Sequence, residues 1–299
     1  MAPSRLVVVV GGANVDVKAR STSALVDATS NPGTVVRTPG GVGRNVAENL
    51  ARLGSRVALV SVVGSDPDGD WLLDETASAG VDVSPVLRGG QTGRYVALLD
   101  AGGDLVAGVS DMAATDSLGP EVLDHDLLRS AALVVVDGNI PATTLDAVLA
   151  LGVRVVIDPV SVAKAERIAP LLRAGRPVFA MTPNEAELVA LGSVDDLHRR
   201  GVEIVWVRRG AAGSLLSHSP EHSVVGPGRA QQPSIELEAP AVTPVDVTGA
   251  GDAMLAAFCH YVLAGAHLDE AARAGHEAAA LTVASPHTVR PDLGERMAR

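Results

Sequence analysis

Two aspartates lie six positions apart in the segment PVDVTGAGDAMLAAF, directly before an apolar run. Gly249, Ala250 and Gly251 have small or absent side chains, so their N–H groups could point at an anion. These donors would sit at the positive end of a helix that begins near Asp252. A carboxylate beside them could act as a general base where negative charge develops. An acid in a first helical turn also stabilises the helix, which accounts for Asp252 but leaves Asp246 unexplained.

A second glycine-rich segment, TPGGVGRNVAENLARLG, precedes another helical pattern. Gly40, Gly41 and Gly43 leave the backbone bare and bring it close to another group, while Asn45 is predicted to open the helix. Asparagine is an ordinary N-cap. Three glycines within four positions are not explained by capping alone.

The first apolar run ends in the polar segment GGANVD. Asn14 and Asp16, two positions apart on extended chain, should point to the same side. They could grip neighbouring hydroxyls, or they could form a polar turn after the first strand. The segment lacks the third glycine and the following helix of a dinucleotide fingerprint, which disfavours an NAD-dependent oxidoreductase.

Short apolar runs separated by helical patterns predict the elements that position these residues. The helical patterns at 45–54 and 142–152 each end in glycine. Strand, helix, strand in repetition predicts an α/β fold with a mostly parallel central sheet. The predicted strands are 6–10, 57–64, 132–138, 153–158, 178–182 and 202–207.

Residues 15–38 and 92–111 alternate with a period of two and predict a small antiparallel β-sheet lid, with a hairpin turn at AGGD. Such a sheet often serves as a lid or a dimer contact. A surface loop is expected at 217–234. The main α/β domain would then comprise residues 1–14, 39–91 and 112–299.

The composition excludes several classes of partner. A net charge of −11 argues against nucleic acid or an anionic membrane as a partner. The single cysteine, Cys259, cannot form an internal disulfide, and no apolar stretch reaches the roughly 20 residues of a spanning helix. We therefore predict a cytoplasmic protein.

The segments DVTGAGD and GGVGRN together resemble the two signature motifs of the PfkB group, the ribokinase-like sugar and nucleoside kinases. The order of the motifs GANVD, VGSDPDG, TPNEAEL and VRRGAAG agrees over essentially the whole chain. The resemblance implies a ribokinase-like three-layer sandwich with a β lid that pairs two copies into a homodimer. It also implies a kinase that uses ATP and Mg²⁺, with K⁺ as a further candidate ion.

Site residues follow from the resemblance, position by position. Asp252 would be the base that takes the proton of a ribose 5′-hydroxyl, beside an anion hole formed by Gly249, Ala250 and Gly251. Glu187 would hold Mg²⁺ through water, and Asp246 could frame a monovalent cation. The implied substrate contacts are Asn14, Asp16, Gly40, Gly41, Asn45, Asn139 and Asp111. The implied nucleotide contacts are Asn184, Arg208, Gly210, Gly213 and Thr248.

Two positions depart from the family pattern. Val42 stands where some sugar kinases of the group carry a lysine, and Arg208 stands where threonine is frequent. Within the family, several stretches are most similar to members that phosphorylate pseudouridine, whose free ring N1–H needs an acceptor such as Asp111, Thr92 or a lid carbonyl. Ribokinase, adenosine kinase or fructokinase activity is the alternative. A nucleoside-sensing protein without turnover would be expected to lack the base or the anion-hole glycines.

Overall fold

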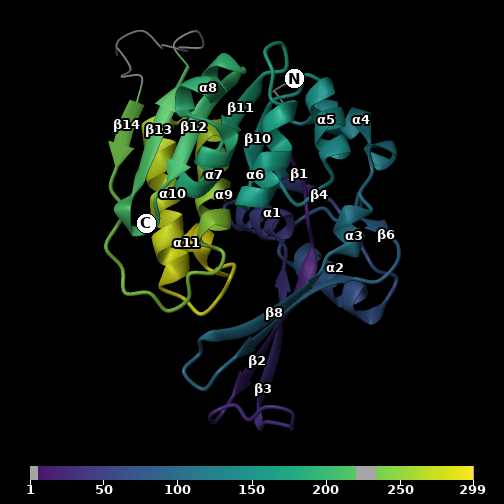
Figure 1. The fold of residues 1–299 in the computed structure, drawn as a ribbon. Helices are drawn as coiled ribbons and strands as arrows, with labels where there is room; N and C mark the ends of the chain where they lie inside the picture. The colour runs from purple at the N-terminus through teal and green to yellow at the C-terminus, as the bar shows by residue number, and fades with distance from the viewer. Residues whose placement is uncertain (1–5, 220–233, 299) are drawn as a thin grey trace.

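An eight-stranded sheet forms the centre of the protein, as the computed structural model describes for residues 6–219 and 234–298 (Figure 1). The strand order is β14-β13-β12-β11-β10-β9-β1-β4. The six neighbouring strands from β4 to β12 in this order pair in parallel, and β13 pairs antiparallel with both β12 and β14. The strands are β1 (Leu6–Val10), β4 (Arg56–Val60), β9 (Leu133–Asp137), β10 (Val155–Asp158), β11 (Val178–Met181), β12 (Val202–Arg208), β13 (Ser214–His218) and β14 (Ser234–Leu237).

Apolar runs in the parallel strands are buried on both faces, which explains why they do not alternate with polar residues. In β1, Val7 and Val9 pack into the core on one face, and Val8 and Val10 pack into the core on the other. The first core includes helices α1 (Val42–Arg52), α2 (Pro67–Ser78), α9 (Ala250–Ala264) and α10 (Leu268–Val283). The second includes α4 (His125–Ser130), α5 (Ala142–Ala150), α6 (Val162–Ile168), α7 (Glu185–Leu191) and α8 (Val194–Arg199). The predicted three-layer fold is confirmed.

A second sheet projects from one end of the main body (Figure 1). Its strand order is β3-β2-β7-β8, from β2 (Asn14–Ser21), β3 (Gly33–Gly40), β7 (Gly93–Leu99) and β8 (Leu105–Asp111). The prediction of an antiparallel sheet is wrong for the central pair, because β2 and β7 run parallel. Strands β2 and β3 form one antiparallel hairpin, and β7 and β8 form another. The two hairpins pair with each other through their first strands, β2 and β7.

The hairpin turn predicted at AGGD is confirmed between β7 and β8, where Gly103 has a φ of 97° and its N–H donates to the Asp100 carbonyl. Most of the loop expected at 217–234 lies outside the described residues. The remaining elements are β5 (Val62–Val63), β6 (Leu87–Arg88), α3 (Ala113–Asp116), α11 (Leu293–Met297) and the 3₁₀ turns η1 (Pro120–Val122), η2 (Ala169–Leu171) and η3 (Gly210–Ala212). Within the described ranges, no helix has the length and apolar character needed to span a membrane.

Candidate active site

The candidate site lies at the carboxyl ends of the parallel strands, where open α/β sheets bind their ligands. Asp137 ends β9, Asp158 ends β10 and Arg208 ends β12. The loop after β1 leads into Asn14. Helix α9 begins at Ala250, directly after the left-handed N-cap Gly249. Segments distant in sequence therefore meet at one edge of the sheet.

Asp137 holds the first two glycine-rich segments together. Its carboxylate Oδ2 accepts the backbone N–H groups of Gly12, at 2.9 Å, and Gly43, at 2.6 Å. A Cβ on Gly11 would meet the Asp137 carboxylate, and a Cβ on Gly43 would lie 2.7 Å from the Cα of Gly11. These glycines therefore permit close contact between two backbone segments. Gly41, with a φ of 96°, similarly packs against the Gly12 carbonyl.

The predicted sugar-side residues lie together where the lid leaves the main body. The Asn14 amide donates to Asp16 Oδ1 at 2.7 Å, and burial raises the pKa of Asp16. Gly40 provides space for this carboxylate, because a Cβ there would lie 2.5 Å from Asp16 Oδ2. Asn139 lies beside Gly12, with its Cβ 3.8 Å from the position that a Gly12 Cβ would occupy.

Asp111 is exposed at the end of β8, on the far side of Gly93 from Asn14. A Cβ on Gly93 would lie within 3.2 Å of the Asp111 carbonyl and 3.3 Å of the Asn14 Cβ. Thr92 is already engaged, since its hydroxyl donates to Asp66 Oδ1 at 2.6 Å and accepts the Gly64 N–H.

Asn45 is not the N-cap that its position predicted. Helix α1 starts at Val42 with Gly41 as its N-cap, so Asn45 lies inside the helix. Its side chain is buried, and its Nδ2 donates to Asp252 Oδ2 at 2.9 Å across 207 positions. Arg44 Nη1 donates to Asn45 Oδ1 at 2.9 Å, which fixes the amide orientation so that Nδ2 faces the carboxylate. Arg44 is in turn paired with the buried Glu48.

The pKa of Asp252 is strongly raised. Burial raises the pKa of Asp252 to about 7, and the nearby carboxylates of Asp158 and Asp137 shift it in the same direction. The hydrogen bond from Asn45 and the charge of Arg208 oppose the shift. A carboxylate with a pKa near neutrality can both accept a proton and remain largely ionised above pH 7, as a general base requires.

The N-terminus of α9 forms the candidate anion hole. Gly249 has a φ of 80°, and a Cβ at this position would collide with the Thr288 carbonyl. A Cβ on Gly251 would lie 2.9 Å from Arg208 Nη1. Ala250 lies between them in the first turn, where helical N–H groups have no carbonyl partner within the helix.

Arg208 is held in place by two carboxylates, Asp158 at the end of β10 and Glu187 in the first turn of α7. Its Nη1 and Nη2 donate to Asp158 Oδ2 and Oδ1 at 2.9 and 3.0 Å, and Nη2 lies 3.8 Å from Glu187 Oε2. The two carboxylates keep the pKa of Arg208 raised in spite of its burial. A bidentate pair of this kind fixes the guanidinium plane. The cation is therefore held against Gly251.

The remaining nucleotide-side residues have clear local roles. Asn184 and Glu187 form a reciprocal capping box at α7, with both backbone-to-side-chain bonds at 2.9 Å, and burial raises the pKa of Glu187. Gly213 packs against the Leu237 carbonyl of β14, and Gly210 is exposed. The backbone of Asn184 forms an isolated parallel β-bridge with the backbone of Arg208, so the capping box lies beside the arginine.

Asp246 contacts a cation from the lid. Its Oδ2 accepts a hydrogen bond from Lys18 Nζ at 3.0 Å, and its Oδ1 accepts the Thr248 N–H at 2.9 Å. No cluster of three or more His, Cys, Asp or Glu side chains suited to a metal ion occurs in the described part of the chain. Near Arg208, Asp158 and Glu187 supply carboxylate oxygens, the donor type that Mg²⁺ prefers.

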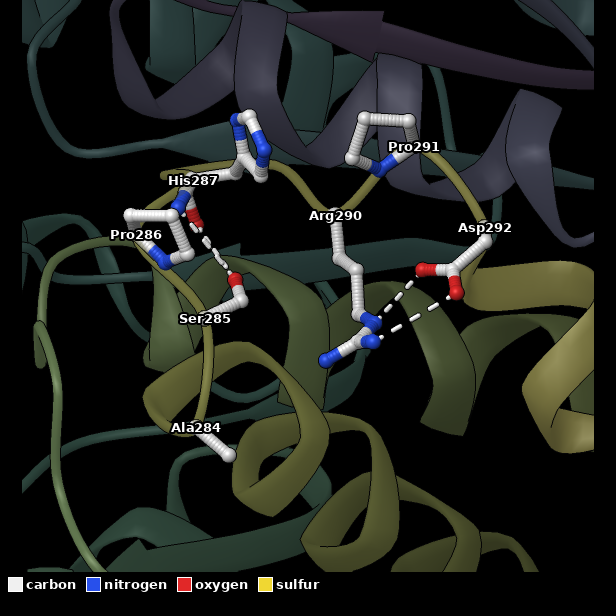
Figure 2. A pocket seen from close by; sticks show the side chains of 7 residues that line it. All are labelled: Ala284, Ser285, Pro286, His287, Arg290, Pro291 and Asp292. Atoms are coloured by element: carbon white, nitrogen blue, oxygen red, sulfur yellow. Dashed lines mark hydrogen bonds and ion pairs between the residues drawn. The ribbon is translucent and has the colours of Figure 1, made fainter.

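A hollow of about 380 Å³ is lined by Ala284, Ser285, Pro286, His287, Arg290, Pro291 and Asp292 (Figure 2). Its wall is kept in shape by Arg290, whose guanidinium pairs with Asp292 and whose Nη1 donates to the Leu281 carbonyl. Thr288 of this segment contacts Gly249, so the hollow adjoins the start of α9.

Three site residues were not identified from the sequence. Asp137 and Asp158 each end a buried strand, and a carboxylate in that position is a signal that could have revealed them. Arg44 carries no such signal, because its function depends on its contact with Asn45.

The fold and the site define a phosphotransferase that acts on a hydroxyl group. The family model "pfkB family carbohydrate kinase" matches residues 4–293, and the chain belongs to this family of ATP-dependent kinases. Its substrates are therefore small molecules together with ATP.

Individual relatives act on different acceptors. The chain is 33% identical to the pseudouridine kinase of Escherichia coli K12, over 96% of this chain and 93% of that protein. It is 29% identical to the guanosine-inosine kinase of Exiguobacterium acetylicum, over 93% and 94%. The structure of Arabidopsis thaliana ribokinase complexed with ribose and ATP matches with a TM-score of 0.80 and 25% identity, over 99% of both chains.

Proposed function

We propose that the protein transfers the γ-phosphoryl group of ATP to the 5′-hydroxyl of a ribonucleoside, and that this nucleoside is pseudouridine. The contact between Asn45 Nδ2 and Asp252 Oδ2 carries the proposal. This hydrogen bond joins α1, which follows Gly40 and Gly41, to α9, whose N-terminus is the candidate anion hole. A hydroxyl held by Asn45 would therefore lie next to the candidate base.

The reaction needs in-line positioning and neutralisation of charge. Asn14 and Asp16 would hold the ribose hydroxyls while Asp252 accepts the proton of the 5′-hydroxyl. The oxygen of that hydroxyl forms a bond to the γ-phosphorus as the bond to the β-phosphate oxygen breaks, and ADP leaves. The N–H groups at the start of α9 would face the transferring group.

Asn184 and Glu187 would hold Mg²⁺ through water, and the metal would neutralise charge on the phosphates. Arg208 supplies a fixed positive charge at the same edge. The lysine that some sugar kinases of the group carry before the first helix is Val42 in this chain. The hollow lined by residues 284–287 and 290–292 would offer space for another part of the nucleotide, and Thr288 of the same segment contacts Gly249.

Similarity to the E. coli pseudouridine kinase supports pseudouridine as the acceptor, while similarity to the guanosine-inosine kinase makes purine nucleosides the competing candidates. Pseudouridine has a ring N1–H that uridine lacks, so a selective site needs an additional acceptor. The Thr92 hydroxyl is engaged by Asp66 and Gly64, and Asp111 pairs with Arg94, which pairs with Val15 on the opposite side of the lid from Asn14 and Asp16. We therefore assign this function to a lid carbonyl.

The test is a panel of pseudouridine, uridine, adenosine, inosine, ribose and fructose with Mg²⁺–ATP, with the product identified by ³¹P and ¹H NMR. The proposal predicts pseudouridine 5′-phosphate and a kcat/KM for pseudouridine at least about tenfold above that for uridine, since one additional acceptor contributes about 1.4 kcal/mol or more. Asp111→Ala should leave this preference unchanged, because Asp111 lies on the opposite side of the lid from Asn14 and Asp16. Equal efficiency with both nucleosides would refute the assignment of pseudouridine.

We further propose that the lid joins two copies of the chain in the cytoplasm. Its strands expose the apolar side chains of Val35, Leu105 and Val109 to 72%, 58% and 67%. Apolar side chains gathered on one projecting sheet are typical of an interaction surface. Light scattering on the wild type and on Val109→Asp tests this, with a dimer expected for the first and a monomer for the second.

A further inference from the structure

One side of strand β2 carries polar residues. Asn14, Asp16, Lys18 and Arg20 alternate along β2 and therefore share a side of the lid. Asn14 and Asp16 are joined by a hydrogen bond at the candidate sugar site. Lys18, the next residue on this side, reaches across to Asp246, which is 228 positions away. A lid cation is thus placed two residues beyond the candidate substrate contacts.

Asp246 stands at the start of the loop that leads to the anion hole. Its Oδ1 accepts the Thr248 N–H at 2.9 Å, and its Oδ2 accepts a hydrogen bond from Lys18 Nζ at 3.0 Å. The N–H of Val245 donates to the Val283 carbonyl at 2.8 Å. Both carboxylate oxygens of Asp246 are therefore engaged by groups of the chain itself.

We propose that Lys18 is a built-in monovalent cation for the anion-hole loop, supplied by the lid, so that the loop needs no dissolved potassium ion at Asp246. The proposal rests on the proposed kinase function and goes beyond it, because it assigns a positioning residue on a different element. The Lys18 ammonium carries the same single charge as a potassium ion. The pair also couples the lid position to the geometry of residues 246–249.

The strength of the pair limits the expected effect. The side chains of Lys18 and Asp246 are 38% and 28% exposed, so solvent screens their attraction. Pairs of this exposure change an equilibrium by about twofold to fivefold. A purely structural surface pair would produce a change of the same size that does not depend on which cation is dissolved.

The experiment measures the affinity for Mg²⁺–ADP by calorimetry with the full chain. Each protein is titrated at about 0.1 M ionic strength in KCl and in tetramethylammonium chloride, whose methyl groups keep its charge from direct contact with carboxylate oxygens. The variants are Lys18→Met, the charge-preserving Lys18→Arg and the control Arg20→Met. Arg20 lies on the same side of β2 and donates to the Ala101 carbonyl, away from Asp246.

For the wild type, Lys18→Arg and Arg20→Met, Kd should differ by less than about twofold between the two salts. For Lys18→Met, Kd should weaken about threefold to fivefold in tetramethylammonium chloride and return to within about twofold of the wild type in KCl. Thermal unfolding of each variant confirms that the fold is retained.

The proposal is overturned if KCl tightens wild-type binding about tenfold or more, because a dissolved ion would then still be needed. It is also overturned if Lys18→Met matches the wild type in both salts, or if its loss is not restored by KCl. Nucleotide binding is read without any acceptor, so these outcomes are separate from failure of the nucleoside proposal.

Discussion

Replacement of Asp252 by asparagine should inactivate the protein and stabilise it. The amide keeps the size of the carboxylate and retains an oxygen that can accept from Asn45 Nδ2. It cannot take a proton from a hydroxyl, so kcat should fall by about 10²- to 10⁴-fold, the range for loss of a general base. Affinity for the nucleoside should change by less than about threefold, because the side chain still fills the same space.

The stability gain follows from the raised pKa. Burial raises the pKa of Asp252 from 3.8 to about 7, and each pH unit corresponds to about 1.4 kcal/mol. The unfolded chain releases this proton near pH 3.8 and the folded chain near pH 7, so the wild type loses stability between these values as the pH rises. Above pH 7 the cost reaches about 4 kcal/mol. The substituted protein does not bear this cost, because its amide is neutral throughout the range.

Urea unfolding followed by circular dichroism at pH 5, 6, 7 and 8 measures the difference. The stability of Asp252→Asn relative to wild type should increase from pH 5 to pH 7 and then stay constant. Asp74→Asn, an exposed change on α2, controls for loss of a carboxylate. A difference that is independent of pH, or a turnover within about tenfold of the wild type, would refute this reasoning.

Substitutions at four further positions test the surrounding site. Gly249→Ala should destabilise the fold by more than about 2 kcal/mol, because the new methyl group meets the Thr288 carbonyl at a positive φ. Gly251→Ala should weaken ATP binding and destabilise the fold by less than about 2 kcal/mol, because the new methyl group lies 2.9 Å from Arg208 Nη1 and disturbs its pair with Asp158. Urea unfolding and calorimetry measure the two effects. Arg208→Gln should lower the free energy of unfolding by about 3 kcal/mol, because the buried carboxylate of Asp158 loses its partner. A free energy of unfolding equal to that of the wild type would contradict this pairing. Asp137→Ala should cost about 2 kcal/mol or more, since buried glycine N–H groups lose their acceptor; unchanged unfolding would contradict that bonding.

The sequence predicted the strands and the start of the helix that follows the glycine-rich loop, because these depend on local signals. The run Leu6–Val10 predicts a strand buried on both faces, and Gly249 with Gly251 indicates a backbone opened toward a charge. The predicted start of the helix near Asp252 agrees with α9, which begins at Ala250.

Local sequence patterns did not predict the contacts between distant segments. Asn45 fits the profile of an N-cap, yet Gly41 starts the helix and leaves the Asn45 amide to bond to Asp252. The parallel pairing of β2 with β7 depends on how two hairpins leave the main body. The Lys18–Asp246 pair joins residues from opposite ends of the chain, and neither local sequence indicates the other.

The central claim is that Asp252, oriented by Asn45, is a base with a pKa near neutrality. The most direct test is the pH dependence of kcat/KM for pseudouridine from pH 5 to 9, with Mg²⁺ in excess, for the wild type and Asn45→Ala. The wild-type value should rise with unit slope to a plateau above about pH 7, and the inflection of Asn45→Ala should lie at higher pH, because the hydrogen bond that favours the carboxylate is lost. A flat profile, or an inflection that moves to lower pH in the variant, would contradict the account.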